Sequence, residues 1–94
     1  MSEPPITVRL PAELRPLCGG RDAVTVAAGD VRALLAALAR EHAAVHRRIC
    51  EDTGVPRQHI GLFVNDDSIR LLAGLDTRLQ SGDVVSILPA VSGG

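Results

Sequence analysis

Two short segments near the N-terminus alternate apolar and polar residues, the pattern of a half-buried β-strand. Ile6–Leu10 has apolar residues at its first, third and fifth positions, and Ala23–Ala27 repeats a similar alternation. The intervening Pro11–Arg21 contains Gly19-Gly20, which supplies backbone freedom for a connection. These features predict two strands that pair antiparallel, with the apolar side chains of the first strand facing inward.

The next segment has the spacing of an amphipathic α-helix. Asp30 is a suitable N-cap, because its carboxylate can accept a hydrogen bond from the first turn. The apolar residues that follow fall at i, i+3, i+4 and i+7 and form one stripe: Val31, Leu34, Leu35 and Leu38. Burying each leucine contributes about 1.5–3 kcal/mol before conformational entropy is subtracted, so this stripe is the expected hydrophobic anchor. A second helical stretch is expected over Ala43–Cys50, ended by Thr53–Pro56.

The second half of the chain contains three further strand-like segments. Ile60–Val64 is an apolar run, and Asn65–Ser68 is its predicted turn, since Asn and Asp tolerate left-handed backbone. Ser68–Leu71 is predicted to return as a short strand. Val84–Leu88 is rich in apolar residues and forms the final strand, whose pairing Pro89 ends because proline has no N–H.

This order of elements predicts an α+β fold in which one main helix covers one face of a mixed sheet of four to five strands. The last strand should lie parallel beside the first, with the intervening segment as the crossover. One set of residues should be helix-facing: Val8, Leu34, Leu38, Leu62, Val64, Val85 and Ile87. The alternate set should lie on the open face of the sheet: Phe63, Val84, Ser86 and Leu88.

The apolar members of that open-face set allow two interpretations. Phe63 and Leu88, with Val84 nearby, can form a docking patch for a partner, because solvent-exposed apolar clusters commonly mark interfaces. Alternatively, Phe63 and Leu88 can belong to a secondary core beneath a loop.

Length and charge narrow the class of protein. Ninety-four residues are enough for one domain, which we expect to span 1–94 with a protruding tail at 90–94. The net charge is −1 and no basic block is present, so nucleic acid and anionic membranes are not expected partners. The N-terminal Met1–Pro5 has no apolar run of the kind found in signal peptides, which favours a cytoplasmic protein.

Candidate catalytic and metal-binding residues are few. Cys18 and Cys50 lack C-x-x-C spacing and are interpreted as ordinary thiols. His42 and His46 would share a helix face, yet no third ligand is near them, so no metal site is predicted. Asp66-Asp67 is better explained by turn chemistry than by acid–base catalysis. No nucleophile–base pair or phosphate-binding loop is present, and we therefore expect a protein that is not an enzyme.

The chain ends in small residues, Ala90–Gly94, directly after the final strand. Gly93 and Gly94 have no Cβ, so they can enter a narrow channel in another protein at little steric cost. A strand that delivers a Gly-Gly tail presents a free carboxylate on a compact domain. That carboxylate becomes reactive when a partner converts it into an acyl-adenylate.

Three segments of the sequence resemble one known family: Phe63–Arg70, Gly74–Thr77 and Gly82–Gly94. They are similar to the ThiS/MoaD family of ubiquitin-like sulfur carriers. The resemblance implies a β-grasp fold and a thiocarboxylate on Gly94, formed by an E1-like adenylyltransferase/sulfurtransferase that uses ATP. The carrier itself would need no cofactor. It also implies that Val91, Ser92 and Gly93 thread into the partner.

Within this family, the chain looks most like the carriers of a thiocarboxylate-dependent route to cysteine. That resemblance implies two further partners, a PLP-dependent cysteine synthase and a zinc metallopeptidase that releases cysteine from the tail. The extended Cys50–Ile60 connection favours this branch over the minimal thiazole carriers. Sulfur delivery for molybdopterin or thiamine-thiazole synthesis stays open, as does a ubiquitin-like interaction module or protein tag.

Overall fold

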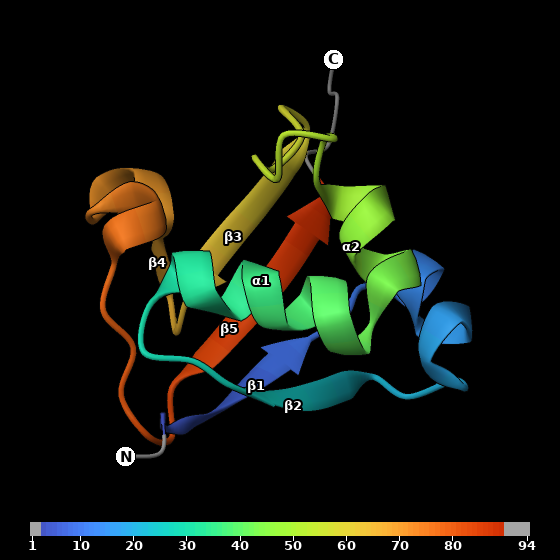
Figure 1. Cartoon of the computed structure of the whole chain (residues 1–94), viewed down its shortest axis with the longest axis horizontal. Helices are drawn as coiled ribbons and strands as arrows, with labels where there is room; N and C mark the ends of the chain where they lie inside the picture. Colours follow the sequence, from blue (N-terminus) through green and yellow to red (C-terminus); the bar gives the residue numbers. More distant parts are fainter. Residues whose placement is uncertain (1–2, 90–94) are drawn as a thin grey trace.

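The last strand of the chain occupies the centre of a five-stranded mixed sheet. The computed structural model describes residues 3–89 (Figure 1). The strand order across the sheet is β2-β1-β5-β3-β4. The strands are β1 (Pro5–Arg9), β2 (Ala23–Ala27), β3 (Ile60–Val64), β4 (Asp67–Ser68) and β5 (Val84–Pro89).

The helices connect these strands, and α1 crosses one face of the sheet (Figure 1). The helical segments are η1 (Ala12–Cys18), α1 (Val31–Glu41), α2 (Ala43–Ile49), η2 (Ile69–Leu71) and η3 (Gly74–Asp76), where η denotes a 3₁₀ helix. Asp30 caps α1 as predicted, since its carboxylate accepts a hydrogen bond of 2.7 Å from the N–H of Ala33. Within residues 3–89, no helix is long and apolar enough to cross a membrane.

Pairing within the sheet confirms the predicted topology. β1 and β2 pair antiparallel, with Val8 opposite Val24. β5 lies parallel to β1, with Val8 opposite Val85, and antiparallel to β3. The chain between β2 and β5 supplies the crossover that a parallel pair requires. β5 therefore has a strand on each side, and residues 90–94 follow it directly in the sequence.

The hydrophobic core lies between the sheet and α1. All the residues predicted to face the helix are buried: Val8, Leu34, Leu38, Leu62, Val64, Val85 and Ile87. Val45 and Ile49 of α2 are also fully buried, which confirms the second helical stretch and its inward residues. The core is built from aliphatic side chains and Cys50, and the single aromatic residue, Phe63, is not part of it.

Two predicted connections differ in the structure. The expected strand over Ser68–Leu71 is wrong, because β4 ends at Ser68 and η2 follows. The Ser68 hydroxyl accepts a hydrogen bond of 3.2 Å from the N–H of Arg70, and this local bond stabilises the 3₁₀ turn in place of the ladder. Pro11–Arg21 also contains a helical turn that glycine and proline content did not predict, and Gly19 ends that turn at φ 67°.

The turn between β3 and β4 is shorter than the predicted Asn65–Ser68, because Asp67 and Ser68 form β4. Val64 pairs with Asp67, which leaves Asn65 and Asp66 as a two-residue turn. Asn65 has φ 55°, in the left-handed region that Asn tolerates better than most residues. Its side-chain oxygen accepts a hydrogen bond of 3.1 Å from the N–H of Val84. This bond connects the hairpin to the start of β5.

Candidate functional site

The open face of the sheet has the side chains that the alternation of β3 and β5 predicts. Phe63, Val84 and Ser86 are half-buried on this face, and Leu88 is 47% exposed. Their neighbours along the strands point the other way into the core. The exposure of Leu88 does not support the alternative of a secondary core beneath a loop.

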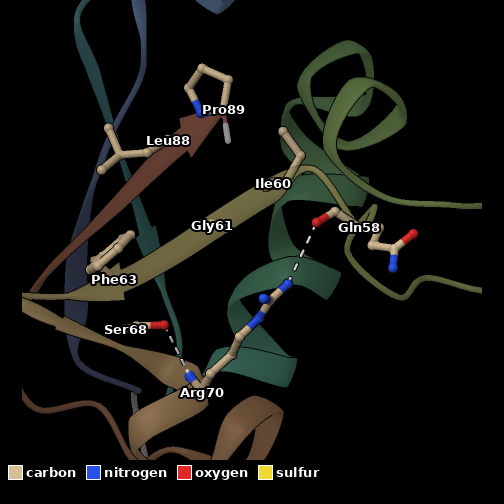
Figure 2. A pocket seen from close by; sticks show the side chains of 8 residues that line it. All are labelled: Gln58, Ile60, Gly61, Phe63, Ser68, Arg70, Leu88 and Pro89. Atoms are coloured by element: carbon tan, nitrogen blue, oxygen red, sulfur yellow. Dashed lines mark hydrogen bonds between the residues drawn. The ribbon is translucent and has the colours of Figure 1, made fainter. Parts of the chain in front are cut away.

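A groove of about 300 Å³ opens on this face beside the end of β5 (Figure 2). Its lining residues are Gln58, Ile60, Gly61, Phe63, Ser68, Arg70, Leu88 and Pro89. Phe63 and Leu88 thus come together at one site, as predicted, whereas Val84 lies on the same face outside the groove. The volume is at the lower end of the range for ligand pockets, and a groove of this size can receive side chains of a partner protein.

Gly61 shapes the floor of this groove. A Cβ atom added at Gly61 would lie 3.2 Å from Cε1 of Phe63 and 3.5 Å from the carbonyl oxygen of Leu88. The Phe63 ring therefore lies against the backbone of Gly61, where any side chain would displace it. Gly61 also stands opposite Leu88 in the β3–β5 pair. The sequence pattern alone did not single out this glycine.

Arg70 forms the polar side of the groove. Its Nη2 atom donates a hydrogen bond of 3.5 Å to the carbonyl oxygen of Gln58, so the side chain extends from η2 along the outer side of β3 (Figure 2). A guanidinium has five N–H donors, and this contact uses one of them. Arg70 is exposed, and its remaining donors can bind a carboxylate.

A second hollow lies on the other side of the end of β5. It has a volume of about 220 Å³ and contains Arg48 and His59 as well as Glu13. Ile60 and Pro89 line both this hollow and the groove. Pro89, the last described residue before the tail, therefore lies between two concave surfaces that each contain an arginine.

Several of the predicted site residues belong to the C-terminal tail. Val91, Ser92, Gly93 and Gly94 lie outside the described residues, as does Ala90. Their roles in threading and in thiocarboxylate formation remain predictions. The structure describes the chain up to Pro89, the last residue of β5.

The histidines predicted on one helix face do not lie on one continuous helix. His42 has φ −139° and ends α1 before α2 begins, so its backbone is not helical. Its Nδ1 atom lies 3.9 Å from Sγ of Cys18, a contact between distant segments that the sequence did not reveal. No group of three potential metal ligands occurs within residues 3–89.

The second cysteine is a core residue. Cys50 is 2% exposed, and burial raises the pKa of its thiol to about 11, against an opposing electrostatic effect of Arg57. Because the thiolate is the reactive form of cysteine, Cys50 is poorly suited to nucleophilic chemistry at neutral pH.

A helix across a mixed sheet, with the C-terminal strand at the sheet's centre, defines a ubiquitin-like β-grasp protein. The sequence pattern of the ThiS family matches residues 8–94, and the chain belongs to this family. The sulfur carrier protein CysO of Mycobacterium tuberculosis is 33% identical over 91 residues, which cover 95% of this chain and 98% of that protein. The chain is accordingly a small protein carrier of sulfur and not a catalyst.

Solved structures agree with this assignment. A chain in the BexX/CysO complex of Amycolatopsis orientalis superposes with a TM-score of 0.83 and 31% identity, covering 95% of this chain and 99% of that one. The small archaeal modifier protein 1 of Methanosarcina acetivorans gives a TM-score of 0.85 and 29% identity over 100% of this chain and 99% of that one. These two relatives therefore share the fold of this chain over nearly its whole length.

Proposed function

We propose that this protein carries sulfur as a thiocarboxylate on Gly94, formed by an E1-like adenylyltransferase/sulfurtransferase and used for cysteine biosynthesis. The observation that carries the proposal is the position of β5. This strand is held on both sides, by β1 and β3, and its last residue, Pro89, lies beside an open apolar groove. The sequence continues for five small residues to a terminal glycine.

The chemistry follows from the carboxylate. A carboxylate is a poor electrophile because its oxygen is a poor leaving group. Attack of the Gly94 carboxylate on the α-phosphate of ATP releases pyrophosphate and gives an acyl-adenylate. A sulfur nucleophile supplied by the partner then displaces AMP and leaves the thiocarboxylate. The partner binds the ATP that is consumed, and the carrier contributes the tail and the surface through which it docks.

Docking is assigned to the open face of the sheet. Phe63 and Leu88 line the groove, and Val84 extends the apolar surface toward the other end of β5. Apolar side chains that are exposed in the free protein become buried against a partner, which favours association. This surface adjoins Pro89, the residue from which the tail continues; we call this position the tail exit. Docking there would also orient the tail toward the partner's active site.

The use in cysteine synthesis is proposed from the likeness to CysO. In this route, the thiocarboxylate sulfur of Gly94 would add to an aminoacrylate held by a PLP-dependent cysteine synthase. A zinc metallopeptidase would then hydrolyse the bond between the tail and the new cysteine, and the carrier would regain its free carboxylate. The folded domain takes no covalent part in these steps.

The proposal is tested by intact-mass spectrometry of the full chain after incubation with the E1-like enzyme of the source organism, ATP and sulfide. We expect the mass increase that corresponds to replacement of one oxygen by sulfur. A variant lacking Gly94 should show no increase, and Leu88→Ala should react more slowly at low carrier concentration. An unmodified full chain, with the enzyme active on another carrier, would contradict the proposal.

A second candidate is a protein modifier, favoured by the likeness to small archaeal modifier protein 1. Activation would be the same, but a lysine amine of a target would attack the acyl group and form an isopeptide bond. The two functions differ in the step that follows activation and can be distinguished there. A sulfur carrier passes sulfur to an acceptor and regains its carboxylate, whereas a modifier forms adducts whose mass includes the target protein.

A further inference from the structure

The residues around the tail exit include two arginines on opposite sides of Pro89. Arg70 lines the groove on the open face, and Arg48 of α2 lines the hollow on the other side. Both side chains are exposed. One carboxylate, that of Glu13, shares the hollow with Arg48, and His59 lies there as well. The local charge is therefore positive, although the whole chain has a net charge of −1.

Neither arginine is neutralised within the part of the chain that the structure describes. Among residues 3–89, the one ion pair joins Arg32 of α1 to Asp76 of η3 and involves neither of these two arginines. Arg70 donates to a backbone carbonyl, which orients the guanidinium without cancelling its charge. An exposed, oriented guanidinium can bind a carboxylate with two parallel hydrogen bonds.

The opposite end of β5 has the opposite charge. Asp83 precedes the strand, and Asp66 and Asp67 lie in or beside the turn next to it. Asp83 is fixed by hydrogen bonds to its carboxylate from the Asn65 side chain at 3.2 Å and from the Gln80 N–H at 2.8 Å. The carrier is thus electrically asymmetric along β5, and a charged partner would favour one orientation during approach.

We propose that the tail exit docks onto an acidic rim of the activating enzyme, with carboxylates around the mouth of the channel that receives Gly94. Arg48 and Arg70 would each contact this rim, and an apolar side chain of the enzyme would occupy the groove between Leu88 and Phe63. The inference rests on the proposed function and adds the chemistry of the partner's surface. It assigns a recognition role to two residues outside the apolar patch.

Of the two arginines, Arg70 has the geometry for the more specific recognition of a partner. Its guanidinium lies at the edge of the apolar groove, where water would be displaced when a partner docks (Figure 2). A carboxylate next to an apolar side chain would match this combination. Lysine at position 70 would keep the charge but lose the bidentate geometry. The affinity of Arg70→Lys for the activating enzyme should therefore lie between those of the wild type and Arg70→Glu.

The experiment measures binding and activation separately. Binding of the activating enzyme to the full chain is measured by calorimetry at low and high salt, and thiocarboxylate formation is followed by mass at increasing carrier concentration. Arg48→Glu and Arg70→Glu are compared with Arg40→Glu, a matched reversal on an exposed position of α1. We expect each tail-exit reversal to weaken binding by about tenfold or more, since like charges then meet at the interface.

The maximal rate of thiocarboxylate formation should change little, because neither arginine is placed at the reacting carboxylate. Added salt should weaken wild-type binding more than it weakens binding of the reversed variants. Equal binding by Arg40→Glu and both tail-exit variants would overturn the acidic rim while leaving the carrier function intact. Arginine-dependent binding without any thiocarboxylate would support the rim and contradict the proposed function.

Discussion

The buried thiol of Cys50 makes the stability of this protein dependent on pH in the alkaline range. Burial raises the pKa of this thiol in the folded state from the ordinary value of 9.0 to about 11. Between these values the unfolded chain loses the proton while the folded chain retains it. The unfolded state then binds fewer protons, so the free energy of unfolding falls as pH rises through this interval.

The magnitude follows from the width of the interval. Each pH unit over which the two states differ by one proton is worth about 1.36 kcal/mol, so the loss is at most about 2.7 kcal/mol between pH 9.0 and about 11. The chain is unusually suited to this test because it contains neither lysine nor tyrosine. Those side chains titrate near pH 10 in most proteins and would obscure the effect of a thiol.

Urea unfolding at closely spaced pH values should reveal this loss in the wild type. Cys18→Ala, which retains the buried thiol, should follow the same slope. Cys50→Ala should be less stable at neutral pH because it leaves a small cavity, yet its stability should vary much less in this range. A Cys50→Ala profile with the wild-type slope would refute the assignment of the effect to this residue.

Substitutions at four further positions test the fold and the groove. Asp30→Ala removes the cap of α1 and should lower the free energy of unfolding in urea by about 0.5–2 kcal/mol, and Asp30→Asn should cost less. Leu34→Ala should cost about 2–5 kcal/mol in the same assay, because the side chain is fully buried. Asn65→Ala should be less stable to heat than Asn65→Gly, since both lose the side-chain bonds but only alanine is strained at φ 55°. Gly61→Ala should displace the Phe63 ring and raise the carrier concentration needed for half-maximal thiocarboxylate formation; an unchanged value would contradict the role of the groove in docking.

Local sequence patterns predicted most of the framework, because each element has a period set by its own geometry. The stripe that begins at Val31 defines α1, and the alternation along β3 and β5 determines which side chains are buried. The strand prediction for Ser68–Leu71 was wrong because this segment is very short and a local hydrogen bond competes with strand pairing. In that bond the Ser68 hydroxyl accepts from the N–H of Arg70. Apolar periodicity contains no information on that competition.

The groove was only partly predictable, because strand alternation determines some of its residues and the packing of loops determines the others. Phe63 and Leu88 were expected together because strand alternation places both on the open face. Arg70 and Arg48 reach the tail exit from η2 and α2, and their proximity to Pro89 depends on how loops are packed. No spacing in the sequence indicates such proximity. Gly61 was missed because its role depends on the Phe63 ring that packs against it, and the sequence does not reveal this contact.

The central position of β5 has a mechanical consequence. A partner that draws in the tail pulls along the axis of β5, whose residues pair with β1 and with β3. A load in this direction shears the two ladders, so their hydrogen bonds resist it together and do not open one after another as they would at a free edge. A partner that held the tail would therefore load the middle of the sheet, where two ladders share the tension, and not a free edge.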